Sequence, residues 1–180
     1  MAQEAHVMVR VALEHTVLLH WVVERGDAGV AAMLASQSKS VNRSVRTMRQ
    51  AELVAPPEVE REIERLTPDF NESEVVGQFR QVCEQLGVLD LYVVYGVESV
   101  FVHPSVATVN AYCDDCGSLV ISPARDIHRG NFALLAPCLI WAGRDLDRLV
   151  PRQPRTEGLE KLAASIGAHG ALPPYRDGSA

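Results

Sequence analysis

Apolar residues recur along most of the chain at helical spacing, and no alternating segment of convincing strand length is present. The pattern predicts helical segments over residues 4–25, 28–54, 57–66, 72–87, 89–103 and 131–150, with short ones at 105–113 and 157–168. Proline at position 137 is expected to kink the late helix. The chain is therefore predicted to be all-α: a single-domain bundle of six to seven helices over residues 1–170, with a flexible tail over 171–180.

The first segment, residues 4–25, is apolar on every side, which predicts a buried helix. Arg10 and Glu14 share one narrow stripe of this helix. Buried charges must be paired and hydrogen-bonded. One interpretation is a structural ion pair that fixes the register of the helix, and the other is a functional pair that faces a cleft.

The segment 89–103 is rich in Val and Tyr, yet its polar side chains follow one another at intervals of four residues. Tyr95, Ser99 and His103 then share one helical face within roughly 80°. This spacing favours a helix over a strand. The proline that follows His103 ends or bends the helix, and Ser105 can cap the next one.

These two helices are expected to pack side by side with their polar stripes facing each other, because each stripe needs partners. His103 suits a general acid or base, since imidazole titrates near neutral pH. Arg10 suits a bound carboxylate or phosphate. The alternative is a satisfied buried network that specifies packing. The candidate catalytic residues are Arg10, Glu14, Ser99 and His103, and the candidate ligand-binding residues are Tyr95, Ser105 and Tyr112.

The segment 114–130 is the most polar and irregular part of the chain and is expected to be a loop. A C-x-x-C pair, Cys113 and Cys116, stands at its start, with His103 and His128 on either side. A structural zinc site needs four ligands, and no second C-x-x-C or H-x3–5-H is present. We therefore expect no metal and no cofactor, and interpret the pair as partly buried cysteines at a helix end.

Four basic side chains recur along the second half of segment 28–54: Lys39, Arg43, Arg46 and Arg49. The following segment, 57–66, is acidic. The favoured interpretation is a hairpin of two exposed helices with complementary charge. The alternative is a face that contacts phosphate groups.

The net charge of −6 gives no global attraction to nucleic acid or to an anionic membrane, although a local basic patch is compatible with it. No run of about 18 uncharged apolar residues exists, so we expect no membrane span and no membrane partner. No signal peptide is recognised at the start. Four scattered cysteines do not make a disulfide scaffold. Together these features predict a cytoplasmic protein with reduced thiols.

Residues Arg10 to His15 form an R-x4-H motif, which resembles the signature of the HEPN superfamily of helical ribonucleases. The resemblance implies metal-independent cleavage of RNA, with an Arg and a His of each subunit acting in a homodimer of a toxin or phage-defence system. Val11 departs from the polar residue that usually follows the Arg there. His15 also stands about 140° from Arg10 on an ideal helix.

A wider resemblance covers roughly residues 5–150. The R-x3-E of Arg10 and Glu14, followed by S-x3-HPS from Ser99 to Ser105, resembles an uncharacterised bacterial family of helical proteins. The resemblance implies an all-helical domain in which Arg10, Glu14, Ser99 and His103 are shared polar residues. It implies no particular reaction.

Three functions therefore stay open. The first is an intracellular helical protein whose buried polar pocket binds a small or phosphate-bearing ligand. The second is a HEPN-like endoribonuclease with RNA as its substrate. The third is a non-enzymatic protein-interaction module that uses the face with Arg43, Arg46 and Arg49. The residues alone do not decide whether the protein is an enzyme.

Overall fold

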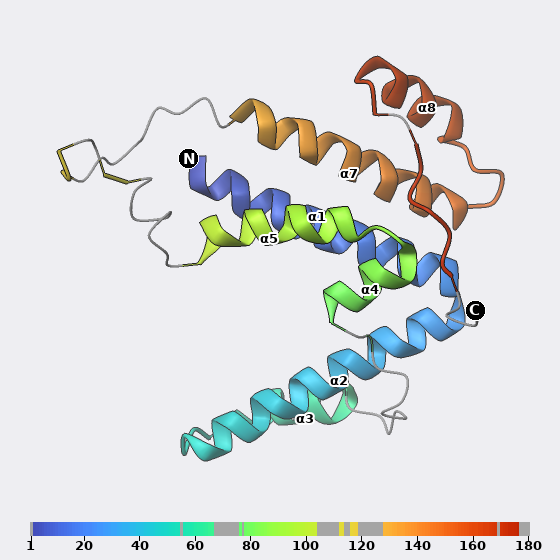
Figure 1. The fold of residues 1–180 in the computed structure, drawn as a ribbon. Coiled ribbons are helices and arrows are strands. Elements are labelled where there is room, and N and C mark those ends of the chain that lie inside the picture. Colours follow the sequence, from blue (N-terminus) through green and yellow to red (C-terminus); the bar gives the residue numbers. More distant parts are fainter. Residues whose placement is uncertain are drawn as a thin grey trace.

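The computed structural model describes residues 2–54, 56–66, 76, 78–103, 112–113, 116–118, 128–168 and 170–176. These residues form seven helices and no strand, so the predicted all-α fold class is confirmed. Figure 1 shows the helices α1 (Ala2–Arg25), α2 (Asp27–Gln50), α3 (Pro57–Leu66), α4 (Phe79–Leu86), α5 (Leu89–Val102), α7 (His128–Arg148) and α8 (Thr156–Ser165).

Most predicted helices lie within a few residues of their observed bounds. The loop predicted over 114–130 needs a correction at its end, because α7 already begins at His128. The helix predicted over 72–87 is observed as α4 only from Phe79, and the stretch 67–75 lies outside the described residues. Most of the helix predicted over 105–113 also lies outside them.

Helix α1 is the element on which the bundle is built, since α2, α4, α5 and α7 all pack against it. Its buried side carries Val9, Leu13, Val17 and Trp21. The prediction that α1 is buried all round is wrong on the opposite side, where Met8 is 62% exposed. The neighbouring helices cover only one side of the N-terminal half of α1.

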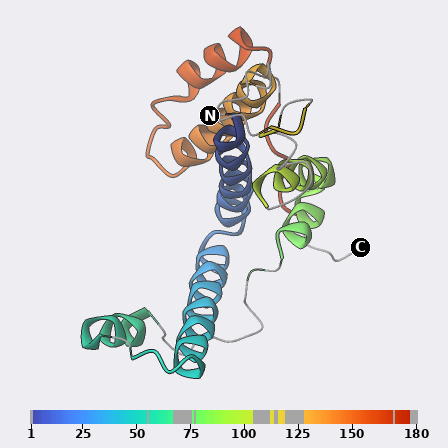
Figure 2. The ribbon, with the colours of Figure 1, turned by 90° about the vertical axis from the view of Figure 1, so that its left-hand side faces the viewer.

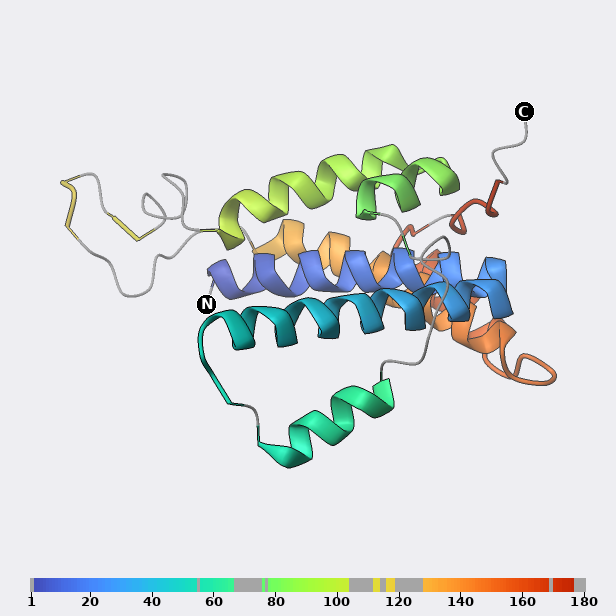
Figure 3. The ribbon, with the colours of Figure 1, turned by 90° about the horizontal axis from the view of Figure 1, so that it is seen from below.

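Two helices flank α1 in opposite directions. Helix α5 runs antiparallel to α1, so that His6 meets Glu98 and Arg10 meets Tyr95 (Figure 3). This register fixes which polar residues of the two helices come together, because each step along α1 is a step backwards along α5.

Helix α7 runs parallel to α1 (Figure 1). The Thr16 hydroxyl donates to the carbonyl oxygen of Cys138, and one turn further His20 meets Asp145. Pro137 lies inside this helix, as predicted. Helix α8 then packs back on α7, where Gly143 leaves the room that Leu159 fills.

The core joins α1, α4 and α7 and contains two of the four cysteines. Burial raises the pKa of the Cys83 thiol to about 12 and that of Cys138 to about 11. Both therefore stay protonated at neutral pH, in agreement with the interpretation of Cys83 as a core residue rather than a reactive one.

Residues 170–176, here named the C-terminal strap, cross the ends of α1, α4 and α7. Leu172 is only 8% exposed and joins the core. The Arg176 amide donates to the Gln85 carbonyl oxygen, and the Tyr175 ring meets Trp21 edge-on. Residues 171–176 of the predicted flexible tail thus make apolar contacts and hydrogen bonds that composition does not reveal.

Helices α2 and α3 form a hairpin that extends away from the rest of the bundle, here named the α2–α3 arm (Figure 2). Its base is tight: Gly26 has a φ of 56°, and a Cβ at Gly29 would stand 2.8 Å from the Val22 carbonyl oxygen. The hairpin itself was predicted. Its predicted charge complementarity stays a prediction, because the side chains of Glu60, Glu62 and Glu64 lie outside the described part of the structure. The four basic side chains of α2 form no ion pair with a described residue.

Candidate functional site

Two histidines, His6 and His20, lie about four turns apart on the buried side of α1. Each meets a buried carboxylate from a different helix: Glu98 of α5 and Asp145 of α7. The two pairs are the buried ion pairs among the described residues, and they mark the two polar regions of the molecule. Each pair has its own surroundings.

At the α1–α5 interface, His6 Nδ1 donates to Glu98 Oε2 over 2.6 Å. The His6 ring stacks on Phe101, with ring centroids 4.4 Å apart. Its second nitrogen, Nε2, is buried and has no hydrogen-bond partner among the described residues. The His6 ring is therefore held by one hydrogen bond, to Glu98, and by stacking on the apolar Phe101 ring.

One turn along α1, Arg10 Nη2 donates to the Tyr95 hydroxyl over 2.5 Å. The guanidinium carbon also lies 4.7 Å from the centroid of that ring, and Phe79 packs against the ring from α4. Arg10 Nε is buried, and within the described part of the chain it has no hydrogen-bond partner. The structure thus brings together Arg10 and Tyr95, two of the residues that the sequence singled out.

The other predicted site residues do not converge on this pair. Ser99 donates to the Tyr95 carbonyl oxygen of its own helix. Glu14 is half-buried and forms no hydrogen bond or ion pair with a described residue. His103 is exposed at the end of α5, about 12 Å along the axis from Tyr95.

The antiparallel packing explains this spread: Glu14 lies beyond Arg10 in one direction and His103 beyond Tyr95 in the other. Tyr112 is half-buried, and Ser105 lies outside the described residues. The catalytic role of this set stays a prediction. For the R-x4-H motif, His15 is exposed while Arg10 turns towards α5, so the two side chains point to different sides of α1.

The α1–α7 interface holds a different arrangement around His20. His20 Nδ1 lies 3.0 Å from both carboxylate oxygens of Asp145, and both side chains are almost fully buried. Its Nε2 donates to the carbonyl oxygen of Pro173 in the strap over 2.9 Å. Both ring nitrogens thus meet acceptors, an arrangement that needs the doubly protonated ring.

The pKa of His20 reflects this arrangement. Burial by itself lowers the pKa, but the hydrogen bonds to Asp145 and to the Pro173 carbonyl oxygen raise it, and the net result lies above the ordinary 6.5. The charged form of His20 is therefore the one that holds the strap against α1 and α7.

Arg148 and Glu24 extend the network towards solvent. Arg148 Nη1 donates to Glu24 Oε1 over 2.7 Å and approaches Asp145 Oδ1 at 3.4 Å. The second Glu24 oxygen accepts the Tyr175 amide of the strap. Burial by itself raises the pKa of Glu24, but the bonds from Arg148 and from the Tyr175 amide lower it below 4.5.

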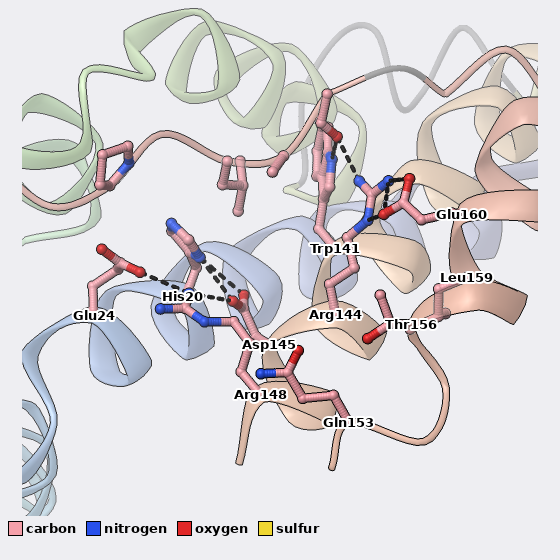
Figure 4. A pocket seen from close by; sticks show the side chains of 14 residues that line it. His20, Glu24, Trp141, Arg144, Asp145, Arg148, Gln153, Thr156, Leu159 and Glu160 are labelled. Carbon is pink, nitrogen blue, oxygen red and sulfur yellow. Dashed lines mark hydrogen bonds and ion pairs between the residues drawn. The ribbon is translucent and has the colours of Figure 1, made fainter. Parts of the chain in front are cut away.

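These groups line a cleft of about 540 Å³ between α1, α7, α8 and the strap (Figure 4). Arg144 forms one wall, where its guanidinium makes two hydrogen bonds of 3.0 Å with the Glu160 carboxylate and a third with the Gly170 carbonyl oxygen. Further lining residues include Trp141, Gln153, Thr156 and Leu159. The cleft is thus charged, and most of its charges are paired.

One cation of the cleft keeps hydrogen-bonding capacity. Both contacts of Arg148 use Nη1, and its Nε and Nη2 have no partner among the described residues. The side chain is 45% exposed. Two parallel N–H donors on a planar guanidinium are the arrangement that binds a carboxylate or phosphate with two hydrogen bonds.

No group of three His, Cys, Asp or Glu side chains suited to a metal ion occurs in the described part of the chain. Of the C-x-x-C pair, Cys113 is half-buried and Cys116 is exposed. None of the described helices is long and apolar enough to cross a membrane.

A family model matches residues 1–118, about two thirds of the chain. The chain belongs to a family of unknown function, DUF5677. The expectation of an uncharacterised helical family is thereby confirmed, whereas the match adds nothing to the resemblance to HEPN ribonucleases. No curated protein and no solved structure matches the chain significantly.

The DUF5677 match covers the polar region at the α1–α5 interface but only part of the cleft. It spans α1 to α5 and so includes both partners of the α1–α5 interface. The cleft combines His20 and Glu24 from the matched part with α7, α8 and the strap, which lie beyond residue 118. The cleft is thus assembled on a DUF5677 helix by the C-terminal third of this chain.

The cleft is not among the sites predicted from the sequence. A signal was nonetheless present: His20 lies on the same stripe of α1 as Leu13 and Val17, so it had to be buried and needed an acidic partner. Asp145 and Asp147 follow the apolar middle of the late helix and were the candidates. Only the structure gives the register between α1 and α7 that selects Asp145.

Proposed function

We propose that the protein binds a small anionic molecule, carrying a carboxylate or phosphate group, in the cleft between α1, α7, α8 and the strap. The observation that carries the proposal is the unused Nε and Nη2 edge of Arg148 on the wall of that cleft. The anion would accept two hydrogen bonds from this edge. The exposed side-chain amide of Gln153, which also lines the cleft, supplies a further donor.

The network behind Arg148 supports the same proposal. Glu24 and Asp145 hold one terminal nitrogen and so fix the plane of the guanidinium before a ligand arrives. A side chain that is already ordered loses less conformational entropy when it binds. The size of the cleft, about 540 Å³, is that of sites for small molecules.

The geometry favours binding over acid–base catalysis. A catalytic histidine needs a ring nitrogen within reach of the substrate. Both nitrogens of His20 are instead engaged, one with Asp145 and one with the Pro173 carbonyl oxygen. The ribonuclease alternative finds no comparable support, since Arg10 and His15 point to different sides of α1.

The test is a titration by isothermal calorimetry with inorganic phosphate, phenyl phosphate and citrate as probes. The matched variant is Arg148→Lys, which keeps a positive charge for Glu24 and Asp145 but loses the planar two-donor edge. Hydrogen bonds to a charged group contribute about 1.5–3 kcal/mol. The variant should therefore bind the best probe about 10–100-fold more weakly.

Arg80→Lys is the control, because Arg80 is an exposed arginine of α4 that is paired with Glu84 away from the cleft. It should bind like the wild type. The proposal fails if Arg148→Lys and Arg80→Lys bind equally well, or if none of the three probes gives a binding heat or raises the melting temperature.

A further inference from the structure

Helix α2 carries four basic residues and only one acidic residue. After Asp27 it has no acidic residue up to Gln50, although the whole chain carries 23 acidic and 17 basic residues. Its four cations are here named the basic row: Lys39, Arg43, Arg46 and Arg49. A helix of this composition in an acidic protein concentrates positive potential in one place.

The basic row is continuous in space. At 100° and 1.5 Å per residue, its members fall within about 120° of the helix surface and span about 15 Å along the axis. All four are exposed. Asn42 and Gln50, also exposed, lie on the same face and add neutral hydrogen-bond donors.

None of the four cations is neutralised within the described part of the chain, since they form no ion pair and no side-chain hydrogen bond there. The half-buried residues of this half of α2 are Val41, Val45 and Met48, on the side opposite the basic row. Helix α3 packs against α2, and Glu58, its one acidic residue with a described side chain, meets Arg61 of α3 itself. The helix dipole favours a cation only in the last turn, which accounts for Arg49 but not for the other three.

The row is also accessible. Figure 2 shows that α2 extends away from the bundle, and of the described helices only α3 lies beside its far half. A long partner can therefore lie along the row without meeting α5, α7 or α8.

We propose that the basic row is a docking surface for the phosphodiester backbone of a nucleic acid. A row of cations over about 15 Å matches several successive phosphates, and guanidinium groups bind phosphate oxygens with two hydrogen bonds. The exposed apolar residues of α2, Val30, Met33 and Leu34, all precede the row. An anionic membrane is less suited, because a helix that lies in a membrane surface buries an apolar face there. This inference is independent of the cleft.

The test is fluorescence anisotropy with labelled 20-nucleotide single-stranded RNA, duplex RNA and duplex DNA, between 50 and 200 mM salt. Contacts with four phosphates give a slope of log affinity against log salt of about −3 to −4, or roughly 100-fold weaker binding across this range. The double variant Arg43→Gln with Arg46→Gln should lower the affinity and make the slope less steep by about 1.5–2.

The control double variant is Arg80→Gln with Lys161→Gln, which removes the same total charge from exposed residues paired with Glu84 and Glu157. It should keep the wild-type slope with whichever nucleic acid binds. The inference is overturned if no nucleic acid binds at 50 mM salt, or if both double variants weaken binding equally. Binding only to poly-glutamate or to phosphatidylserine vesicles would overturn it as well.

Discussion

The two buried histidine–carboxylate pairs on α1 have the same chemistry but different surroundings. His20 meets Asp145 with one ring nitrogen and the strap with the other, and Arg148 joins the same carboxylate at the edge of a cleft. His6 meets Glu98 with one nitrogen, while the other is buried without a partner against Phe101.

The second hydrogen-bond partner of each histidine therefore decides what the pair does. At His20 the second partner is a distant segment of the chain, so the pair holds the strap and shapes the cleft. At His6 the described residues provide no second hydrogen-bond partner, and the pair fixes only the register of α1 against α5. A buried polar atom that lacks a partner lowers the net stabilisation of such an interface.

The largest effect should come from breaking the His20 pair. Asp145→Ala should lower the free energy of unfolding by about 3–5 kcal/mol, because it leaves the buried charge of His20 without compensation. Glu98→Ala should cost less, about 1–3 kcal/mol, since the His6 pair forms fewer bonds. Urea denaturation measures both, and an equal or larger loss in Glu98→Ala would contradict the comparison.

A smaller loss is expected when the strap loses its anchor. Leu172→Ala should cost about 2–3 kcal/mol, as is usual for truncating a leucine in a core. Ile166→Ala, at an exposed position shortly before the strap, is the matched control and should stay within about 0.5 kcal/mol of wild type. Equal midpoints in thermal denaturation for the two variants would show that the strap adds nothing to stability.

The pH dependence of stability should report the charged form of His20. The pKa of His20 is raised in the folded state, so its stabilisation is fully present below pH 6.5 and is lost as the pH rises through the raised pKa. The stability difference between wild type and His20→Gln should therefore shrink above pH 6.5. Denaturation midpoints of both proteins from pH 5.5 to 8.5 measure this difference. A stability difference that grows with pH would refute the conclusion that His20 is charged in the folded protein.

The smallest effect is expected when both members of the His6 pair are replaced. The double variant His6→Leu with Glu98→Leu should stay within about 1 kcal/mol of wild type or be more stable, because an apolar pair leaves no unpartnered nitrogen. The corresponding replacement of His20 and Asp145 should be destabilising, since it releases Pro173 and Arg148. The same urea assay compares the two double variants, and a large loss in the first would assign His6 a greater role.

The sequence predicted the fold well because helical periodicity is a local property. The helix predicted over 89–103 is observed despite its β-branched residues. The spacing of its polar residues also pointed to Tyr95, which does bind Arg10. What the pattern lacks is register. Nothing local says that Glu14 and His103 lie at opposite ends of an antiparallel contact, or that His20 meets a carboxylate 125 positions away.

For a related reason, composition did not reveal the contacts of the strap. Two prolines next to small residues suggested a loosely held tail, yet the Pro173 carbonyl oxygen accepts the His20 bond and Leu172 enters the core. A short irregular segment is ordered by the partners it meets, and these partners come from helices far away in the sequence.

We propose that the His20 side of α1 carries the ligand site and that the His6 side is structural. Chemical-shift mapping by ¹H–¹⁵N NMR during a titration with inorganic phosphate tests it in one spectrum. The expected result is a saturable shift of the Arg148 Nε–H and of the Gln153 side-chain amide, with the Arg10 Nε–H unchanged. Shifts centred on Arg10, or no saturable shift at Arg148, would contradict the account.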